Sequence, residues 1–350
     1  PLPTGFNVIA GPTGSGKSTR WDTEVILDTG EIRLIGEIVE NSLKNSELHF
    51  KLDDGVYTME NPENIRTYGL DPTSMKIVKK DISAFIKREG EKHLFEITTK
   101  TGKSAVTTGC HPIMIFRDGK IVSEVVEKLR EGDLIATPRM LDFPEIEMKL
   151  PVADMGKVSG DKIILYGKRK NSKKIEIPLH VNGDFSRFLG YLVGDGCILK
   201  KVGRCDLTNV DTEIIEDFVN ISKGIGIEPS IYEHKLRAKV VALHSKSLAD
   251  VLVKIFKDRI KKEHKHIPSI VLFSRKSILA NFLAGLFDCD GTVRKDNPTF
   301  EYTTMSENLA NQVQLALLRF GIVARKTKKL KHATNTAKKT KKTYFYITIE

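Results

Sequence analysis

Phe188-Leu-Gly-Tyr-Leu-Val-Gly-Asp195-Gly196 and Leu283-Ala-Gly-Leu-Phe-Asp-Cys-Asp290-Gly291 are two similar stretches that lie 95 residues apart in the chain. Each is an apolar run with small residues that ends in Asp-Gly, a pattern that predicts a helix ending at the acid. The same offset relates Asp211 to Ser306, and each of these is a suitable N-cap for a further helix. A duplicated unit explains these matches, and its second copy, which reaches Glu350, is expected to lack the last helices.

The small residues of the repeated stretches, such as Gly190 and Gly285, would allow the two helices to pack closely. Asp195 and Asp290 would then lie side by side, and adjacent carboxylates repel unless a cation joins them. Two such acids facing a phosphodiester imply a divalent metal, for which Mg²⁺ is the expected ion. An ordinary apolar helix with a glycine cap is the alternative for one copy. Two copies in a basic region favour the metal site.

The net charge of +11 is unevenly distributed along the chain. Residues 1–150 carry 20 Lys and Arg against 24 Asp and Glu, whereas residues 151–350 carry 36 against 21. Clustered cations gain from counterion release on a phosphate backbone, so nucleic acid is the expected partner of the second part. A solvated basic face is the alternative that charge alone leaves open.

One stretch between residues 325 and 342 contains nine basic residues and no acid, with Thr and Asn between them. Basic residues along paired strands suit phosphate contact, and the side chains between them can reach base edges. The candidate DNA-binding residues are Arg325, Lys326, Lys328, Lys329, Lys331, Lys338, Lys339, Lys341 and Lys342. A basic loop without a fixed structure is the alternative.

Residues 11–18 read Gly11-Pro-Thr-Gly-Ser-Gly16-Lys17-Ser18, which fits a phosphate-binding loop at every position. Such a loop needs a helix directly after it, because the helix N-terminus forms much of the anion site. Asp28-Thr29-Gly30 instead lies between two β-prone runs and predicts a hairpin. We therefore expect the loop to be interrupted at Ser18. The competing hypothesis is an intact P-loop NTPase of the secretion type with a basic nucleic-acid-binding region.

Short apolar runs separated by turns continue to about residue 139 and predict an all-β unit. The helical period appears only after residue 183. The predicted organisation is α+β and multidomain: a host fragment 1–17, a β domain 18–140, a linker or accessory arm 141–183 and a duplicated domain 184–350.

The duplicated part resembles the LAGLIDADG homing endonucleases in their intein-borne form. Leu283 to Gly291 matches the nine-residue signature closely, and Phe188 to Gly196 matches it more loosely. The resemblance implies an αββαββα repeat, with the second repeat truncated, whose sheets lie in the major groove of a double-stranded DNA target. It makes Asp195 and Asp290 the metal-binding catalytic acids of a monomeric, Mg²⁺-dependent endonuclease. Lys265, in Lys265-His-Ile-Pro, matches the family's catalytic lysine. A DNA-binding module or maturase without nuclease activity would share this fold.

The β-rich part resembles the N-terminal half of a Hint protein-splicing domain. Ser18-Thr-Arg-Trp-Asp-Thr23 fits its opening, although Trp replaces the usual glycine, and Thr108-Gly-Cys-His111 fits a later block. The resemblance implies that Ser18 attacks the Lys17 carbonyl in an acyl shift without any cofactor. His111 would protonate the departing nitrogen, with Thr108 assisting, and Cys110 is expected to be a small buried packing residue.

The sequence also lacks a feature of that family. Splicing ends at a His-Asn pair, and the chain contains no such dipeptide, so the final step is expected to need residues beyond Glu350. Residues 1–17 resemble the P-loop of type II secretion or pilus ATPases, which makes the host flanks, or exteins, expected partners and ATP a ligand only of the spliced host.

Cysteine usage and hydropathy bear on the compartment. The four cysteines form no CxxC motif, and no apolar run has the roughly 18 residues of a membrane helix. The expectation is a cytoplasmic protein with no membrane partner.

Overall fold

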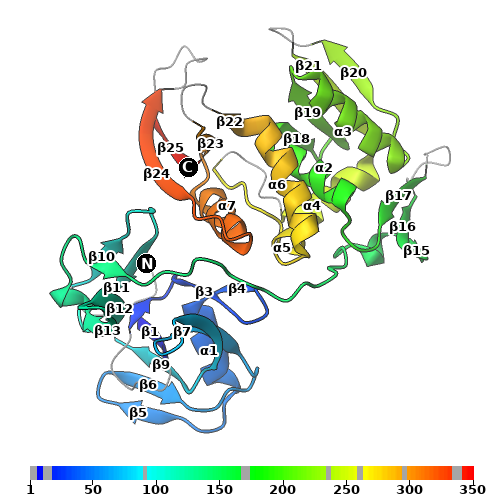
Figure 1. Cartoon of the computed structure of the whole chain (residues 1–350). Helices are drawn as coiled ribbons and strands as arrows, with labels where there is room; N and C mark the ends of the chain where they lie inside the picture. The colour runs from blue at the N-terminus through cyan, green and yellow to red at the C-terminus, as the bar shows by residue number, and fades with distance from the viewer. Residues whose placement is uncertain are drawn as a thin grey trace. The chain divides into compact units, whose positions relative to one another are not determined.

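The computed structural model describes residues 6–10, 18–89, 93–166, 174–233, 238–257, 263–293, 298–332 and 341–350. The chain divides into two units, Pro1–Phe143 and Pro144–Glu350 (Figure 1). Each unit has its own core, and each is described by itself.

The first unit is built on a seven-stranded sheet of order β10-β11-β2-β1-β9-β6-β5. A three-stranded sheet, β13-β12-β14, and the hairpins β3-β4 and β7-β8 accompany it. Its strands are β1 (Phe6–Ala10), β2 (Thr19–Arg20), β3 (Glu24–Ile26), β4 (Ile32–Leu34), β5 (Phe50–Leu52), β6 (Gly55–Thr58), β7 (Arg66–Asp71), β8 (Lys76–Asp81), β9 (Ala84–Arg88), β10 (Phe95–Thr98), β11 (Ser104–Thr107), β12 (Pro112–Arg117), β13 (Lys120–Val125) and β14 (Leu134–Ile135). Its helices are α1 (Ile35–Asn45) and the 3₁₀ turn η1 (Val126–Lys128).

The hairpin predicted after Ser18 is confirmed. Strands β3 and β4 pair from Glu24 opposite Leu34 to Ile26 opposite Ile32, and Gly30 adopts a φ of +90° in the turn between them. This φ lies in the left-handed region that glycine tolerates best. The first helix begins only at Ile35, so residues 18–34, all of which are described, contain no helix.

The expectation of an all-β first unit is wrong in one element, the helix α1. Ile35, Ile38, Val39 and Ser42 of this helix are buried at a spacing of three or four residues. The apolar side chains among them join a core cluster that includes Phe85 of β9. The sequence contains this helical spacing of apolar residues. The helix is short and directly follows a β-strand, however, and the surrounding turns favoured a prediction of strands.

The second unit contains two four-stranded sheets of the same strand order, β18-β19-β21-β20 and β22-β23-β25-β24, and a three-stranded sheet, β15-β16-β17. The strands are β15 (Lys157–Ser159), β16 (Lys162–Leu165), β17 (Ile175–Pro178), β18 (Gly196–Leu199), β19 (Arg204–Asn209), β20 (Ser230–Glu233), β21 (Lys239–His244), β22 (Gly291–Val293), β23 (Phe300–Thr304), β24 (Arg325–His332) and β25 (Lys341–Ile349). The helices are η2 (Ala153–Met155), α2 (Gly183–Asp195), α3 (Thr212–Gly224), α4 (Lys246–Phe256), α5 (Ser269–Leu272), α6 (Lys276–Asp290) and α7 (Glu307–Arg319).

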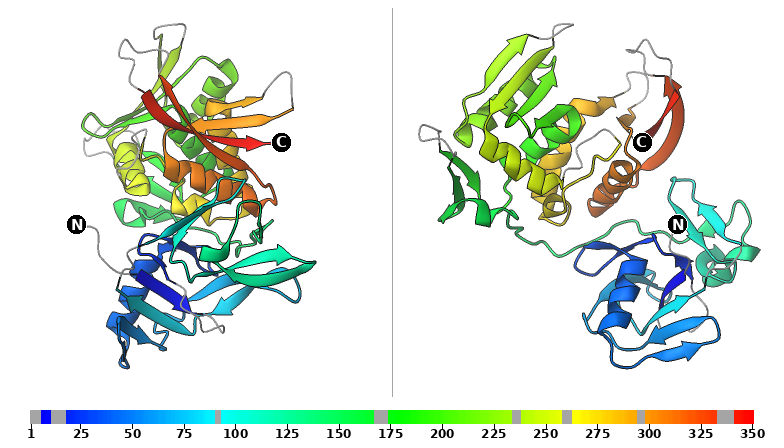
Figure 2. Two further views of the ribbon diagram at one scale, coloured as in Figure 1. Left: turned by 90° about the vertical axis from the view of Figure 1, so that its left-hand side faces the viewer. Right: turned by 180° about the vertical axis from the view of Figure 1, so that it is seen from behind.

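Helices α2 and α6 lie side by side between the two four-stranded sheets (Figures 1 and 2). Helices α2, α3 and α4 pack on the first sheet, and α6 and α7 pack on the second. The predicted N-caps are confirmed: the Asp211 carboxylate accepts from the Glu213 N–H at 2.9 Å, and the Ser306 hydroxyl accepts from the Leu309 N–H at 3.2 Å.

The stretch 141–183, expected to be a linker or accessory arm, contains strands β15 to β17. Ile163 and Ile177 of this small sheet are fully buried. Within the described ranges, no helix is both long and apolar enough to cross a lipid bilayer.

Candidate active site

Glycines set the distance between α2 and α6. A Cβ atom added at Gly190 would lie 2.3 Å from the Phe282 carbonyl oxygen, and one added at Gly285 would lie 2.5 Å from the Arg187 carbonyl oxygen. Both obstacles are backbone atoms, which cannot rotate away. The two helix backbones therefore touch along a seam that only residues without a side chain can form.

The C-terminal ends of the two helices carry the predicted acids. Helix α2 ends at Asp195 and α6 ends at Asp290, and a strand starts directly after each. The residues just before the acids also adjoin, since a Cβ at Gly194 would lie 2.5 Å from the Cβ of Cys289. The seam thus brings both carboxylates to one place.

The electrostatics of the two acids reflect this proximity. Burial raises the pKa of the Asp195 carboxyl to about 6, and the nearby charge of Asp290 adds to the rise. Burial also raises the pKa of Asp290. The Lys265 ammonium lowers the pKa of both groups. Two largely buried carboxylates whose pKa values burial raises, with the charge of Asp290 adding to the rise at Asp195, form a site that a cation would stabilise.

Lys265 reaches the site from the irregular segment before α5. Its Nζ donates to the Gly194 carbonyl oxygen at 2.5 Å, next to Asp195. The structure thus brings together three residues singled out from the sequence: Asp195, Asp290 and Lys265.

Sequence reasoning missed Asn209. Its Nδ2 donates to Asp195 Oδ2 at 2.8 Å, while its Oδ1 accepts from the Asp211 N–H at 2.8 Å. A polar residue at a strand end before a helix cap is typical of a turn, so the sequence contained no separate signal for its contact with Asp195.

The donor set fits Mg²⁺. Within the described part of the chain, no cluster of three or more His, Cys, Asp or Glu residues could hold a metal ion by itself. Mg²⁺, however, is commonly held by one or two carboxylates together with substrate phosphates and water. Asp195 and Asp290 supply such carboxylates, and the neighbouring groups are the Gly194 carbonyl, the Asn209 amide and the Cys289 thiol, whose pKa burial raises.

The predicted DNA-binding cations divide between the two faces of β24 and β25. Arg325, Lys329 and Lys331 alternate along one face of β24, and Lys342 lies opposite Lys331 on β25. The ammonium groups of Lys329 and Lys331 lie 4.9 and 4.6 Å from the ring centre of Tyr346. These four cations form what we call the lysine face.

Lys326 belongs to the other face, where its Nζ donates to Asn311 Oδ1 at 2.5 Å and lies 3.7 Å from a carboxylate oxygen of Glu307. Lys342 also pairs with Glu263 at 3.5 Å. The remaining predicted cations that the structure describes, Lys328 and Lys341, are exposed, whereas Lys338 and Lys339 lie outside the described residues.

Ser18 is a buried residue of the first unit, with 5% of its surface exposed. Its carbonyl oxygen accepts from Thr108 twice, from the backbone N–H at 3.2 Å and from the hydroxyl at 3.4 Å. The His111 N–H donates to the Thr108 carbonyl at 3.2 Å. The chain continues from Ser18 into β2, which pairs with β1 and β11.

Two related expectations have different outcomes. Cys110 is exposed, so its expected burial is wrong, because it lies in a surface turn between β11 and β12. The host-loop residues Gly11, Gly16 and Lys17 lie outside the described residues.

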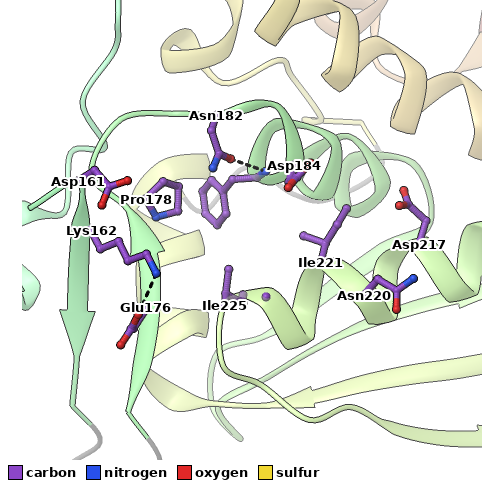
Figure 3. A pocket seen from close by; sticks show the side chains of 12 residues that line it. Asp161, Lys162, Glu176, Pro178, Asn182, Asp184, Asp217, Asn220, Ile221 and Ile225 are labelled. Atoms are coloured by element: carbon purple, nitrogen blue, oxygen red, sulfur yellow. Dashed lines mark hydrogen bonds and ion pairs between the residues drawn. The ribbon is translucent and has the colours of Figure 1, made fainter.

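An acid-lined pocket of about 320 Å³ lies between the three-stranded sheet and helices α2 and α3 (Figure 3). Asp161, Asp184 and Asp217 contribute carboxylates, and Glu176 accepts from Lys162 at 3.1 Å. An excess of carboxylates repels phosphate, so this pocket does not suit a nucleic-acid backbone.

Comparison with known proteins finds a family model described as a LAGLIDADG-like domain, which matches residues 183–268 and 277–349. Among curated proteins, the replication factor C small subunit of Methanocaldococcus jannaschii is 28% identical over 345 residues, which are 98% of this chain and 16% of that protein. The DNA-directed RNA polymerase subunit Rpo1C of Methanocaldococcus jannaschii is 24% identical over 337 residues, 91% of this chain and 37% of that protein. The DNA polymerase II large subunit of Thermococcus kodakarensis is 22% identical over 329 residues, 78% of this chain and 18% of that protein.

The chain thus spans between 16% and 37% of the length of these curated relatives. Among solved structures, the PabCDC21-1 intein is 31% identical, with 37% of this chain and 76% of that chain covered and a TM-score of 0.33. The structure of I-DmoI in complex with DNA and Mn is 16% identical, with 49% and 90% covered and a TM-score of 0.35. The two segments matched by the family model begin at α2 and α6, the helices that end in the two acids, and the second unit is therefore similar to a LAGLIDADG-like domain.

Proposed function

We propose that this chain is an intein, a self-splicing domain that carries a site-specific, Mg²⁺-dependent endonuclease for double-stranded DNA. The observation that carries the nuclease is the glycine seam of α2 and α6, which joins Asp195 and Asp290 beside Lys265. Paired acids with raised pKa values next to a cation suit phosphodiester hydrolysis better than a purely structural role.

The two halves of the second unit contribute to the reaction in parallel. The halves are duplicated repeats, α2 to α4 with the order αββαββα and α6 to β25 with the order αββαββ, and each supplies one carboxylate at the end of its first helix. Asp195 and Asp290 would hold the ion, and its chemistry there would be activation of water and stabilisation of the leaving oxygen. Asn209 fixes the orientation of the Asp195 carboxylate through its 2.8 Å hydrogen bond. Lys265 places a positive charge where negative charge develops on the phosphate.

The DNA duplex binds along the two four-stranded sheets. The lysine face of β24 and β25 supplies phosphate contacts, and Tyr346 beneath it keeps Lys329 and Lys331 in place through cation–π contacts. Thr327 lies between Arg325 and Lys329 on the same face of β24, and Thr348 lies opposite Arg325 on β25. Both threonine side chains can reach base edges.

Splicing begins in the first unit at the Lys17–Ser18 junction. The Ser18 hydroxyl oxygen attacks the Lys17 carbonyl carbon, the carbon–nitrogen bond breaks, and an ester replaces the amide. His111 donates the proton that the departing Ser18 nitrogen needs, and the hydroxyl proton of Ser18 is released in exchange. Thr108 supports this role because it holds the Ser18 carbonyl with two hydrogen bonds.

The relationships to known proteins support a mobile insertion. Relatives with three different names share one segment of 329 to 345 residues with this chain. A segment that inserts into different hosts accounts for such a distribution. The host here is proposed to be a P-loop ATPase that is interrupted between Lys17 and Ser18, and the intein acts in the cytoplasm as a monomer.

The competing NTPase hypothesis requires a helix directly after the phosphate loop, and residues 18–34 contain none. A phosphate loop ends at a helix N-terminus, but Ser18 leads into strand β2 and the hairpin β3-β4. Without that helix the phosphates lose the aligned N–H groups and the dipole that bind them.

Cleavage of a random-sequence plasmid library tests the nuclease. With Mg²⁺, the full chain should cut at one recurrent sequence, and EDTA should stop cutting. Asp290→Asn should abolish cutting because it removes a metal ligand. Asp288→Asn is the matched control, since Asp288 lies on the same helix and pairs with Arg187 instead. Cutting by Asp290→Asn, or no recurrent cut by the native chain, would contradict the proposal.

A further inference from the structure

Lys265 lies on a segment that regular secondary structure does not hold. Residues 263–268 form neither helix nor strand. A lysine side chain is long and flexible, so a fixed ammonium position needs a fixed backbone beneath it. The Lys265 Nζ nevertheless reaches the Gly194 carbonyl, which requires some other element to anchor the segment.

That anchor is helix α7 of the second half. The Ser306 hydroxyl donates to the Lys265 carbonyl oxygen at 2.7 Å, and the Gln312 side-chain oxygen accepts from the Ile267 N–H at 2.7 Å. The two bonds hold the segment on both sides of His266. Ser306 and Ile267 are almost completely buried, so water competes little for either bond.

The Ser306 hydroxyl makes two hydrogen bonds, one as an acceptor and one as a donor. Its hydroxyl oxygen accepts from the Leu309 N–H as the N-cap of α7 and donates its proton to Lys265. An N-cap alone uses only the acceptor, as Ser245 does at the start of α4, where it accepts from the Leu248 N–H at 3.1 Å. The donated bond is therefore an addition specific to the Lys265 segment.

We infer that Ser306 and Gln312 are positioning residues of the nuclease, which hold Lys265 at the carboxylate pair from the opposite half of the domain. This inference rests on the proposed nuclease function. The first half supplies the lysine and Asp195, and the second half supplies Asp290 and the clamp. The lysine is thus in place only when both halves are folded against each other.

Kinetics of cleavage test the clamp. Ser306→Ala and Gln312→Ala should each lower kcat about 10- to 100-fold with unchanged DNA affinity, because misplacement of a charge affects the transition state and not binding. Ser306→Thr, which keeps the hydroxyl, should restore most of kcat. The matched controls are Ser245→Ala, which loses only a cap, and Gln314→Ala, which loses a hydrogen bond of α7 to Ala324.

A double-mutant cycle tests whether Ser306 acts through Lys265. In a Lys265→Ala background, Ser306→Ala should cause no further loss of kcat. An equal additional loss in that background, or equal losses in the two controls, would overturn the inference.

Hydrogen exchange provides a readout that does not need activity. The Ile267 amide should exchange faster in Gln312→Ala than in the native chain, whereas Gln314→Ala should leave its rate unchanged. Unchanged exchange in Gln312→Ala would overturn the clamp even if the native chain cuts DNA. Faster exchange with no DNA cutting by the native chain would instead contradict the proposed function alone.

Discussion

Gly285 illustrates how a single residue decides the geometry of the site. A methyl group at this position would meet the Arg187 carbonyl oxygen at 2.5 Å, and neither backbone can yield without separating the helices. We expect Gly285→Ala to lower the free energy of unfolding by about 1–3 kcal/mol, the usual cost of overpacking. Chemical denaturation measures this difference.

Gly224 is the matched control for that substitution. It is the last residue of α3 in the same unit, and an added Cβ would meet nothing within 4 Å. Gly224→Ala should therefore change the free energy of unfolding by no more than about 0.5 kcal/mol. Equal effects of the two substitutions would contradict the close approach of α2 and α6.

At the scale of elements, the pairing of β24 with β25 determines which cations can meet DNA. Lys329→Ala combined with Lys331→Ala should weaken DNA binding and reduce the slope of log affinity against log salt by about 2, because each lost phosphate contact removes about 0.9. Titrations at several salt concentrations measure the slope. Lys326→Ala is the control on the same strand, since Lys326 faces Asn311 and Glu307. A slope reduced equally by Lys326→Ala would contradict the assignment of the faces.

In the first unit, the packing of helix α1 likewise depends on a neighbouring segment, the one that contains Trp21. Gly36 lies under the Trp21 ring, where an added Cβ would come within 2.1 Å of ring atoms, and its N–H donates to the Trp21 carbonyl at 3.0 Å. Trp21, which replaces the usual glycine of the splicing motif, is thus accommodated by Gly36. This glycine belongs to α1, the helix that the β-like sequence pattern did not predict. The unusual tryptophan and the unpredicted helix therefore belong to one local packing arrangement.

At the scale of the whole molecule, Ser18 separates the two functional hypotheses. If the loop is interrupted, hydroxylamine should cleave the full chain at the Lys17–Ser18 junction, because an ester there reacts and an amide does not. Ser18→Ala should prevent cleavage, since it lacks the attacking oxygen. Mass spectrometry of the fragments identifies the junction.

Ser46→Ala is the control for that experiment, because Ser46 is another buried serine of the first unit whose hydroxyl donates to the Ser42 carbonyl. It should leave junction cleavage unchanged. Tight ATP binding that Lys17→Ala abolishes, without any junction cleavage, would support the NTPase instead.

The sequence by itself determined the features that depend on neighbouring residues. The 95-residue offset, the ends of α2 and α6 at their acids, the caps Asp211 and Ser306 and the hairpin after Ser18 could all be predicted. The offset follows from comparing the chain with itself, and each of the other features follows from periodicity, caps or turn residues, which act within a few positions of the chain. The basic stretch from Arg325 was likewise visible as composition.

Only the tertiary structure decided which distant groups meet. Asn209 contacts Asp195, Ser306 contacts Lys265 across 41 residues of sequence, and Lys326 turns away from Lys329. These contacts depend on how helices pack and how strands register, and no local pattern encodes either. The close approach of Asp195 and Asp290 has the same origin, because it requires glycines on two separate helices to meet at one seam.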